Sequence, residues 1–420
     1  MAGANEACRG RERAFRARGW PGHLAAVLRP SASVAGRVAL ERDAALRRRR
    51  LWGAAVDGFR ERRHPTRRRM RALRAAPGAR LTWQEVPAPP APQPGQAVVH
   101  PIAVATCDLD RQLLLGATPF VLPLHFGHEC VAEVLAVGEG VASVRPGQRV
   151  VVPFQISCGA CQACREGRTG NCLAVPPISM YGFGVAGGHW GGAVSDELLV
   201  PFADAMLVVL PDGIDPAAAA SVADNVADAY RHIGPHLPAL LDDDPDSAVL
   251  ILGGVAGRTS ASASVPLYAG LIARALGAQQ IHFADRRPHV RAHAERLGLL
   301  ALSPRQLRRH PPAPLVLDAS ATRPGLRLAL ESVAPDGVCS CVGSLHRRTS
   351  IPTALMFGRN ATLHLGRSHA RAVIPAVLEL MAQARLAPEQ VTTQLAPLDD
   401  APSALRRHAV GEDTKTILVE

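Results

Sequence analysis

Four cysteines lie within fifteen residues, in the segment CGACQACREGRTGNC: Cys158, Cys161, Cys164 and Cys172. Short Cys-x-x-Cys pairs are strained as disulfides, and we recognise no secretion signal that would take the chain to an oxidising compartment. Zn²⁺ accepts four thiolates in a tetrahedral shell of about 2.3 Å, and this spacing can wrap such a shell. The loop therefore predicts a closed, structural zinc site, with redox chemistry or no metal as the alternative.

A second set of candidate metal ligands precedes this loop. Cys107 lies in ATCDLD and His128 in FGHECVAEV, and a thiolate paired with an imidazole suits zinc. Either residue alone would more often belong to the core, but the neighbouring cysteine loop reverses that balance. A catalytic zinc needs three protein ligands and one open position. The segment SVADNVADAY offers Asp224 as the third ligand, with Asp228 as its nearest rival.

The elements that must position these groups fall into two kinds. From residue 70 to about 210, short apolar runs punctuated by Pro and Gly predict strands. From residue 248 onwards, AVLILGG, IHFAD and PLVLDAS predict strands that alternate with helices such as LYAGLIARALGA. This alternation predicts a parallel sheet with helices on both faces. The segment KTILVE predicts one further strand.

The first strand of the alternating part leads into a turn typical of dinucleotide sites. Gly253, Gly254 and Gly257 follow the strand, although a strict G-x-G-x-x-G is missing. Glycines let the backbone approach a pyrophosphate at the N-terminus of the next helix. Asp285 ends the second strand, where a carboxylate would bond the adenosine ribose and favour NAD. Arg286, with Arg287 after it, could shift that preference towards NADP.

Charge is distributed unevenly along the chain. Residues 1–69 carry 18 Arg and 6 acidic residues, a surplus of 12, whereas the whole chain has a net charge of +11. Residues 70–420 therefore sum to −1, which argues against broad nucleic-acid binding by that part. Residues 1–69 lack apolar periodicity and predict a basic, disordered extension, with an arm for nucleic acid or an anionic surface as the alternative. The sequence contains no run of 18 apolar residues and therefore predicts no membrane span.

Together these motifs resemble the zinc-dependent alcohol dehydrogenases of the medium-chain dehydrogenase/reductase family, over roughly residues 70–420. The resemblance is carried by CDLD, GHECVAEVLAVGEGV, RPGQRVVVP, CGACQACREGRTGNC and the VLILGG turn. It implies an α/β protein in which a GroES-like, β-rich catalytic domain is split in sequence around a Rossmann domain with a doubly wound parallel sheet. The expected parts are an Arg-rich extension at 1–69, the catalytic domain with its zinc loop at 70–226, the Rossmann dinucleotide-binding domain at 227–366, and a return to the catalytic domain at 367–420.

The resemblance also implies roles for individual residues. Cys107 and His128 match the first two catalytic zinc ligands, and Asp224 falls where the third, often Cys, is expected. Glu129 would be a neighbouring or exchanging carboxylate, and Asp110 would orient the imidazole of His128. The four cysteines of the loop match the structural site of the family.

Two departures from the family pattern stand out. Leu109 occupies the place where the family often has a Ser or Thr that relays a proton, so the proton path stays open. The segment GRTSAS is an apparent insertion in the glycine turn, and Pro266 stands where a glycine or small residue is usual.

The activity that follows is hydride transfer between an alcohol, or its aldehyde or ketone, and a nicotinamide cofactor. We expect a cytoplasmic enzyme with two zinc ions per chain, NAD as cofactor with NADP as the alternative, a small-molecule substrate, no nucleic acid, no membrane, and a homodimer or homotetramer. Two rival functions stay open. One is an NADPH-linked carbonyl or enone reductase of the same family, which Cys107, His128 and the zinc loop oppose. The other is a nucleic-acid-associated protein that uses the basic arm.

Overall fold

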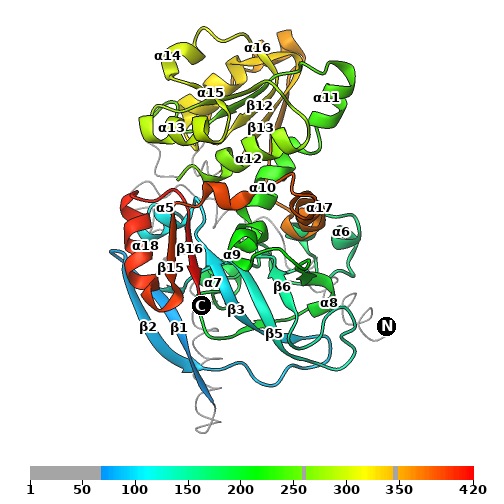
Figure 1. Cartoon of the computed structure of the whole chain (residues 1–420), viewed down its shortest axis with the longest axis vertical. Helices are drawn as coiled ribbons and strands as arrows, with labels where there is room; N and C mark the ends of the chain where they lie inside the picture. The colour runs from blue at the N-terminus through cyan, green and yellow to red at the C-terminus, as the bar shows by residue number, and fades with distance from the viewer. Residues whose placement is uncertain (1–67, 258–261, 344–348) are drawn as a thin grey trace.

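The computed structural model describes residues 68–257, 262–343 and 349–420. These residues form a β-rich lower lobe and an upper lobe built on a parallel sheet (Figure 1). The predicted extension lies outside the described residues up to residue 67. Its last two residues belong to the body, because Arg68 forms an ion pair with Glu197 and the first strand begins at Arg69.

Two sheets make up the lower lobe. A three-stranded sheet has the order β2-β1-β4, and a seven-stranded sheet has the order β15-β16-β3-β5-β6-β8, with β7 also paired to β3. Most residues of the central strand β3 are buried, which agrees with the apolar run that predicted it. The strands are β1 (Arg69–Ala76), β2 (Arg80–Pro87), β3 (Ala97–Ala105), β4 (Leu124–His125), β5 (Glu129–Val137), β6 (Arg149–Val152), β7 (Leu198–Val200), β8 (Val208–Val209), β15 (Gln394–Pro397) and β16 (Thr416–Val419).

Short helices connect these strands. Several are single turns in the loops that carry the candidate ligands. The helices are α5 (Asp110–Leu114), α6 (Gln162–Arg165), α7 (Gly184–Gly187), α8 (Ala203–Met206), α9 (Pro216–Ala219) and α18 (Ala401–Val410), with 3₁₀ turns η1 (Thr169–Asn171), η2 (Ala220–Ala223), η3 (Pro388–Val391) and η4 (Leu398–Asp400).

The upper lobe contains a six-stranded parallel sheet in the order β11-β10-β9-β12-β13-β14. Numbered within the lobe, this order is 3-2-1-4-5-6, the doubly wound arrangement of Rossmann domains. The strands are β9 (Val249–Leu252), β10 (Ile281–Ala284), β11 (Leu300–Leu302), β12 (Ala313–Asp318), β13 (Val333–Cys341) and β14 (Thr362–Leu365). The expected fold class is therefore confirmed.

Helices cover both faces of this sheet. Val249 and Ile251 of β9 pack into the core that contains α12, whereas Leu250 and Leu252 pack into the core that contains α15. A strand buried on both faces needs a continuous apolar run rather than an alternating one. The helices of the upper lobe are α10 (Asn225–Ile233), α11 (Leu237–Asp243), α12 (Ser264–Ala275), α13 (Pro288–Arg296), α14 (Pro304–Leu307), α15 (Arg323–Glu331) and α16 (Thr353–Arg359). The next helix, α17 (Ala370–Ala382), packs against α10 and the turns η1 and η2 instead.

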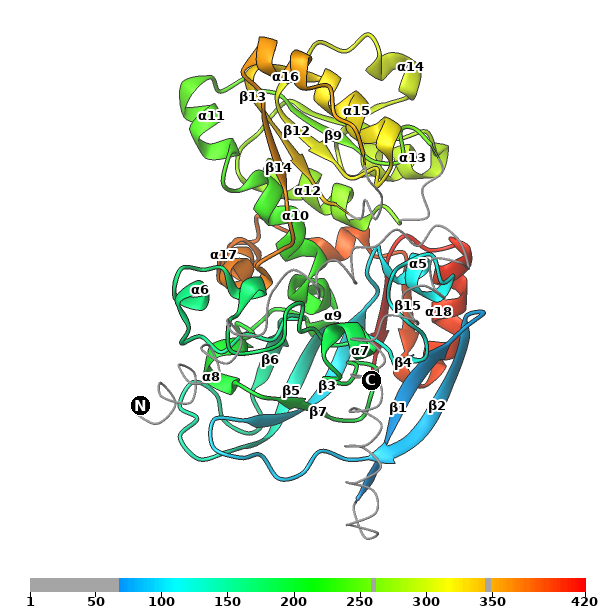
Figure 2. The ribbon, with the colours of Figure 1, turned by 180° about the vertical axis from the view of Figure 1, so that it is seen from behind.

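The chain crosses between the lobes twice. It enters the upper lobe through α10 and comes back through α17, so that α18, β15 and β16 lie beside the early strands of the lower lobe (Figures 1 and 2). The strand β16 is antiparallel to β3, with Ile417 opposite Ala105. This return completes the seven-stranded sheet. The end of its strand β3 leads into Cys107, the first candidate metal ligand.

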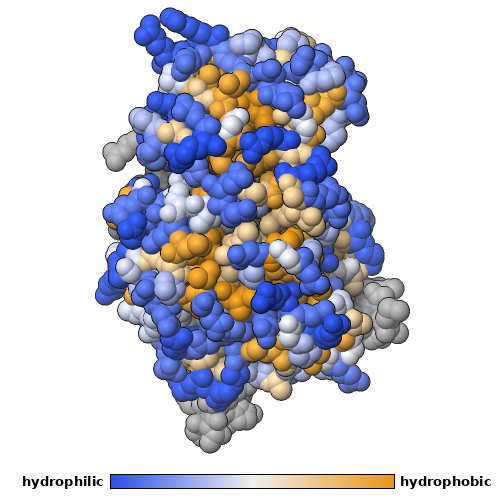
Figure 3. All heavy atoms as spheres, in the orientation of Figure 1, coloured by the Kyte–Doolittle hydropathy of each residue, from blue (hydrophilic) through white to orange (hydrophobic). Residues whose placement is uncertain are grey.

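The outer surface is mostly polar on the face seen in Figure 3, where hydrophobic side chains form separate patches among hydrophilic ones. Among the described residues, no helix has both the length and the apolarity that crossing a bilayer requires.

Candidate metal centres and cofactor site

Four potential ligands converge where the two lobes meet. Cys107 follows β3, His128 precedes β5, Glu129 begins β5, and Asp224 is the residue before α10. Their ligand atoms all lie within 4.8 Å of one another, and all four residues are buried. The antiparallel pairing of Ala105 with Glu129 places the ends of β3 and β5 side by side. The sheet therefore brings together residues that stand far apart in the sequence.

Distances within this group suit a shared cation. The Cys107 Sγ and the His128 Nε2 each lie 3.4 Å from the Asp224 Oδ2. Asp228, the rival third ligand, lies apart from the group. Its Oδ1 is 2.5 Å from the Arg231 Nε, on the same helix α10. The geometry thus favours Asp224 over Asp228.

Unsatisfied polar atoms test whether a metal fits this place. Both nitrogens of His128 and the Oε1 of Glu129 are buried without a hydrogen-bond partner among the described residues. Buried polar atoms are nearly always paired, and a bound cation would satisfy all three of these atoms. A thiolate, an imidazole and a carboxylate are a donor set that zinc accepts, and the arrangement fits the metal.

The protonation of these donors points the same way. Burial raises the pKa of Cys107 well above its usual value, and the nearby Asp224 and Glu129 raise it further. Burial lowers the pKa of His128, but Asp110, Asp224 and Glu129 outweigh that effect and raise it to about 9. The carboxylates that favour a positive charge on the imidazole would equally favour a bound cation.

Asp110 lies beside this group in a role that differs in detail from the expected one. Its Oδ1 is 3.9 Å from the His128 Nδ1, which is longer than a hydrogen bond. Its Oδ2 instead accepts the backbone N–H of Cys107 at 2.8 Å. Asp110 thus fixes the backbone of the Cys107 loop, and its orientation of the imidazole stays a prediction.

The sequence reasoning missed Lys415, which is the only lysine in the chain. Its Nζ is buried and donates to the Glu129 Oε2 at 2.9 Å, to the Asn225 Oδ1 at 3.1 Å and to the carbonyl of Thr106. Burial would lower the pKa of Lys415, but the Glu129 carboxylate raises it by more, so the lysine keeps its charge. That a chain so rich in arginine has a lysine at this one position was the only indication in the sequence that Lys415 has a role.

Asn225 was also missed, and it connects the metal ligands to the upper lobe. Its Nδ2 donates to the Cys107 Sγ and to the Asp224 Oδ2, both at 3.3 Å. Its Oδ1 accepts from the hydroxyl of Ser264, the first residue of α12, at 3.0 Å. One side chain therefore spans the ligand group and the helix expected to face a dinucleotide.

Aromatic rings form an apolar wall beside His128. The imidazole centroid lies 5.8 Å from that of Phe154 and 4.8 Å from that of Phe183. Phe120 in turn lies 4.6 Å from Phe183. This wall reduces the access of water to one side of the ligand group.

The four-cysteine loop forms the second group. The sulfurs of Cys158, Cys161, Cys164 and Cys172 lie within 4.8 Å of one another, and the four residues form no disulfide. Backbone N–H groups point at the sulfurs, from Cys161 to Cys158 at 3.3 Å and from Leu173 to Cys161 at 3.3 Å. The donor set fits a closed zinc site.

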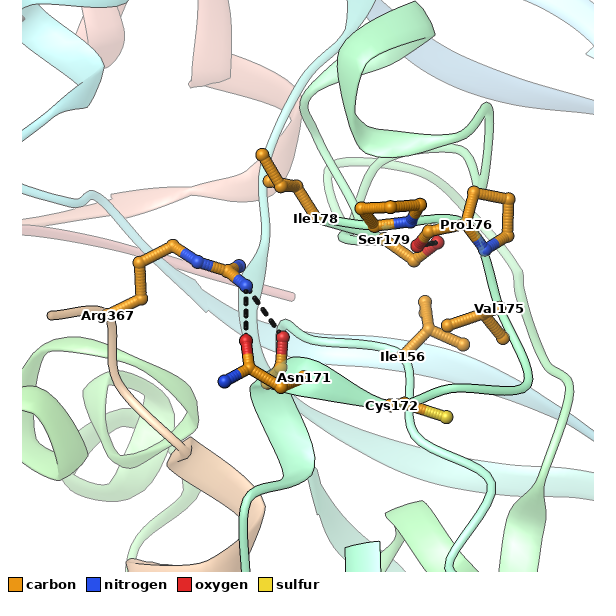
Figure 4. A pocket seen from close by; sticks show the side chains of 10 residues that line it. Ile156, Asn171, Cys172, Val175, Pro176, Ile178, Ser179 and Arg367 are labelled. Atoms are coloured by element: carbon orange, nitrogen blue, oxygen red, sulfur yellow. Dashed lines mark hydrogen bonds between the residues drawn. The ribbon is translucent and has the colours of Figure 1, made fainter. Parts of the chain in front are cut away.

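A cavity of about 100 Å³ lies beside this loop (Figure 4). Arg367 approaches one side of it and donates to the Asn171 Oδ1 at 3.0 Å and to the Gly170 carbonyl at 2.7 Å. Cys172 contributes to its lining, whereas no member of the first ligand group does. The cavity therefore belongs to the surroundings of the cysteine loop.

The predicted cofactor residues meet at the carboxyl ends of β9 and β10. The Asp285 side chain is fully buried, and its Oδ2 accepts the N–H of Gly254 at 2.7 Å. A Cβ on Gly253 would lie 2.5 Å from the same oxygen, so a larger residue there would require the Asp285 carboxylate to move. Gly257 has a φ of +71°, and residues 258–261 of GRTSAS lie outside the described residues.

The two arginines after Asp285 differ in their surroundings. Arg287 forms an ion pair with Asp285, with its Nη2 2.7 Å from the Oδ2, whereas Arg286 is exposed. Burial would raise the pKa of Asp285, but its bonds from Arg287 and Gly254 lower it overall. The carboxylate that was expected to meet the ribose is therefore already engaged within the protein.

Known proteins resemble the chain in both sequence and fold. Residues 93–212 match the family model described as alcohol dehydrogenase GroES-like domain. The glutathione-independent formaldehyde dehydrogenase of Pseudomonas aeruginosa is 33% identical over 225 residues, covering 51% of this chain and 54% of that protein. The match thus spans about half the length of that relative. A probable zinc-binding alcohol dehydrogenase of Mycobacterium tuberculosis is 28% identical over 345 residues, covering 79% of this chain and 84% of that protein.

A solved structure is similar to most of the chain. The alcohol dehydrogenase from Thermus sp. ATN1 is 32% identical, with a TM-score of 0.74, covering 83% of this chain and 99% of that chain. The likeness therefore extends over both lobes.

Proposed function

We propose that this chain, which belongs to the zinc-dependent alcohol dehydrogenases of the medium-chain dehydrogenase/reductase family, transfers a hydride between an alcohol, or its aldehyde or ketone, and NAD. The family resemblance inferred from the motifs is confirmed. One observation carries the proposal: Asn225 bonds the Cys107 Sγ at 3.3 Å and the start of α12 at 3.0 Å. The candidate metal ligands and the candidate dinucleotide helix are thus in direct connection.

Each residue then has a distinct task. Cys107, His128 and Asp224 would hold the zinc, with Glu129 beside them anchored by Lys415. Zinc, when bound there, polarises a substrate oxygen and lowers the pKa of an alcohol. The aromatic wall beside His128 would exclude water and favour an apolar substituent on the substrate. The four cysteines of the loop would bind a second, structural zinc.

The test combines activity with metal analysis. A panel of alcohols and aldehydes is followed by NADH absorbance, and zinc is counted in the same sample. Cys107→Ala, His128→Ala and Asp224→Ala should each lose turnover and retain one zinc per chain, while NADH binding persists. Asp228→Asn should keep two zinc ions. Wild type with no more than one zinc after supplementation, or an Asp224→Ala variant with full activity and two zinc ions, would contradict this ligand set.

Assembly into a homodimer or homotetramer is part of the proposal, and the structure offers one surface for pairing in the dimer. The strand β14 is an edge strand of the parallel sheet, and nearby Phe357 and Leu365 are 91% and 58% exposed. An open edge with apolar side chains suits pairing with a second copy. Light scattering should give twice the chain mass, and Phe357→Asp should halve it. A monomeric wild type would contradict the homodimer.

Domain boundaries and location complete the proposal. The divisions at 226 and 366 are supported by the two crossings through α10 and α17, whereas Arg68 and Arg69 of the expected extension belong to the body. The buried cysteines Cys107, Cys130, Cys339 and Cys341 form no disulfide, which supports a reducing compartment, the cytoplasm. The near-neutral charge of residues 70–420 supports a small-molecule substrate rather than nucleic acid.

A further inference from the structure

Asp108, the residue after the candidate ligand Cys107, reaches across from the lower lobe to the start of α12. Its Oδ1 accepts the backbone N–H of Ser264 at 3.0 Å, and its Oδ2 accepts that of Val265 at 3.2 Å. The hydroxyls of Ser262 and Ser264 also donate to the Oδ1. A single carboxylate thus receives four hydrogen bonds from residues more than 150 positions away.

These donors are the ones that a helix normally offers to a ligand. The N-terminal turn of a helix leaves its first N–H groups without intrahelical partners. In α12, Pro266 has no N–H, and Leu267 already donates to the Ala263 carbonyl at 3.2 Å. Ser264 and Val265 therefore supply the open N–H groups of this turn, and Asp108 takes both.

The glycine turn before the helix is also internally bonded. The N–H of Gly253 donates to the Ala284 carbonyl at 2.9 Å, and that of Val255 donates to the Gly253 carbonyl at 2.8 Å. The N–H of Gly254 donates to Asp285 at 2.7 Å. Within the described part of this turn, the N–H groups available to bind an anion are therefore those at the start of α12.

We propose that Asp108 is a tethered anion that occupies the pyrophosphate position of the dinucleotide site and so sets the affinity for the cofactor. In Rossmann domains the pyrophosphate lies at the N-terminus of the helix after the first strand, which here is α12. A carboxylate and a diphosphate cannot share the same two N–H groups, and their like charges repel. A dinucleotide therefore binds with its pyrophosphate on α12 only when Asp108 leaves. This inference rests on the proposed function.

The size of the effect of Asp108 on cofactor affinity depends on the fraction of molecules in which Asp108 has left the start of α12. When only a fraction of molecules can bind, the apparent Kd rises by the inverse of that fraction. Replacing Asp108 by a neutral residue removes the competing anion. We expect the Kd for NADH to fall by at least about ten-fold, which corresponds to about 1.4 kcal/mol.

The experiment measures binding to the zinc-loaded full chain without turnover. Wild type, Asp108→Asn and Asp108→Thr are titrated with NADH, ADP and adenosine by calorimetry. Both variants can still cap the helix, and thermal unfolding checks that they fold. Asp204→Asn is the matched control, because Asp204 accepts the backbone N–H groups of Ala142 and Ser143 at 3.0 and 2.8 Å in the lower lobe.

NADH and ADP, which carry the pyrophosphate, should bind at least about ten-fold more tightly to both Asp108 variants. Adenosine, which has no phosphate, should bind with unchanged affinity, and the Asp204 variant should match wild type. Unchanged or weaker binding of NADH and ADP to folded Asp108 variants would overturn the inference, as would no binding at all. If Asp108→Asn does not fold, Asp108→Thr decides by the same criterion.

The outcomes separate this inference from the proposed function. Wild-type hydride transfer together with unchanged Kd values in the Asp108 variants would refute the inference alone. Tighter NADH binding in those variants without turnover of any alcohol or aldehyde would support the inference and refute the activity.

Discussion

Replacing Lys415 by methionine is expected to lower the free energy of unfolding by about 3–5 kcal/mol, because it leaves the buried Glu129 without its partner. The Nζ and the Oε2 are 2.9 Å apart, and both side chains are 0% exposed. The exposed pair Arg327–Glu331 has almost the same separation, 2.8 Å, with exposures of 71% and 41%. Arg327→Met should cost no more than about 0.5 kcal/mol, so that burial rather than distance decides the difference.

Urea unfolding of the zinc-loaded protein, followed by circular dichroism, measures these values. The cycle includes Lys415→Met, Glu129→Gln and the double variant. The double variant leaves no unpaired charge in the core, so it should be more stable than the sum of the single losses predicts, by at least about 1.5 kcal/mol. A loss below about 1 kcal/mol for Lys415→Met, or strictly additive effects, would show that the pair does not contribute as argued.

Three further outcomes are expected. Cys161→Ser should lower the melting temperature and promote aggregation, because binding at a structural zinc contributes to folding; a variant that melts like wild type would remove that role. Burial would raise the pKa of Asp228, but Arg231 and His232 lower it to about 2. The ionised Asp228 therefore stabilises the folded protein above pH ~4, and this stabilisation is lost as the pH falls towards 2. Asp228→Asn should therefore cost about 2 kcal/mol at pH 7, a gap that narrows below pH 4 in urea melts; a pH-independent gap would contradict this. Wild type should prefer NAD by at least about ten-fold in kcat/KM, and Asp285→Ser, which releases Arg287 to meet a 2′-phosphate, should erode that preference. Equal or better use of NADP by wild type would refute it.

The four-cysteine site and the parallel sheet could be predicted because short stretches of sequence encode them. The four cysteines converge because their ligand atoms belong to one loop, and their spacing is visible in fifteen residues. The parallel sheet was predictable because alternating strands and helices have few other ways to bury their apolar faces. Cys107 and His128 were predictable as a pair because a thiolate and an imidazole both suit zinc and a four-cysteine loop follows them in the sequence.

Long-range contacts were not predictable, because no local pattern records them. Lys415 reaches Glu129 across 286 positions and Asp108 reaches Ser264 across 156. Sequence reasoning placed Asp285 at the end of its strand, but not its ion pair with Arg287, which depends on how a loop folds back. Position along a strand follows from periodicity, whereas the partner of a charged side chain follows from tertiary packing.

The pairing of β16 with β3 has a consequence for how the protein is made. Thr106 and Thr416, which bond each other beside this pairing, are 310 positions apart. At a synthesis rate of about 5–20 residues per second, β3 waits roughly 15–60 s on the ribosome before β16 exists. Throughout that interval one edge of β3 lacks its partner, and open edges recruit other strands. The upper lobe lies wholly between these two strands and can fold first, so the metal site is assembled late and depends on protection of nascent β3.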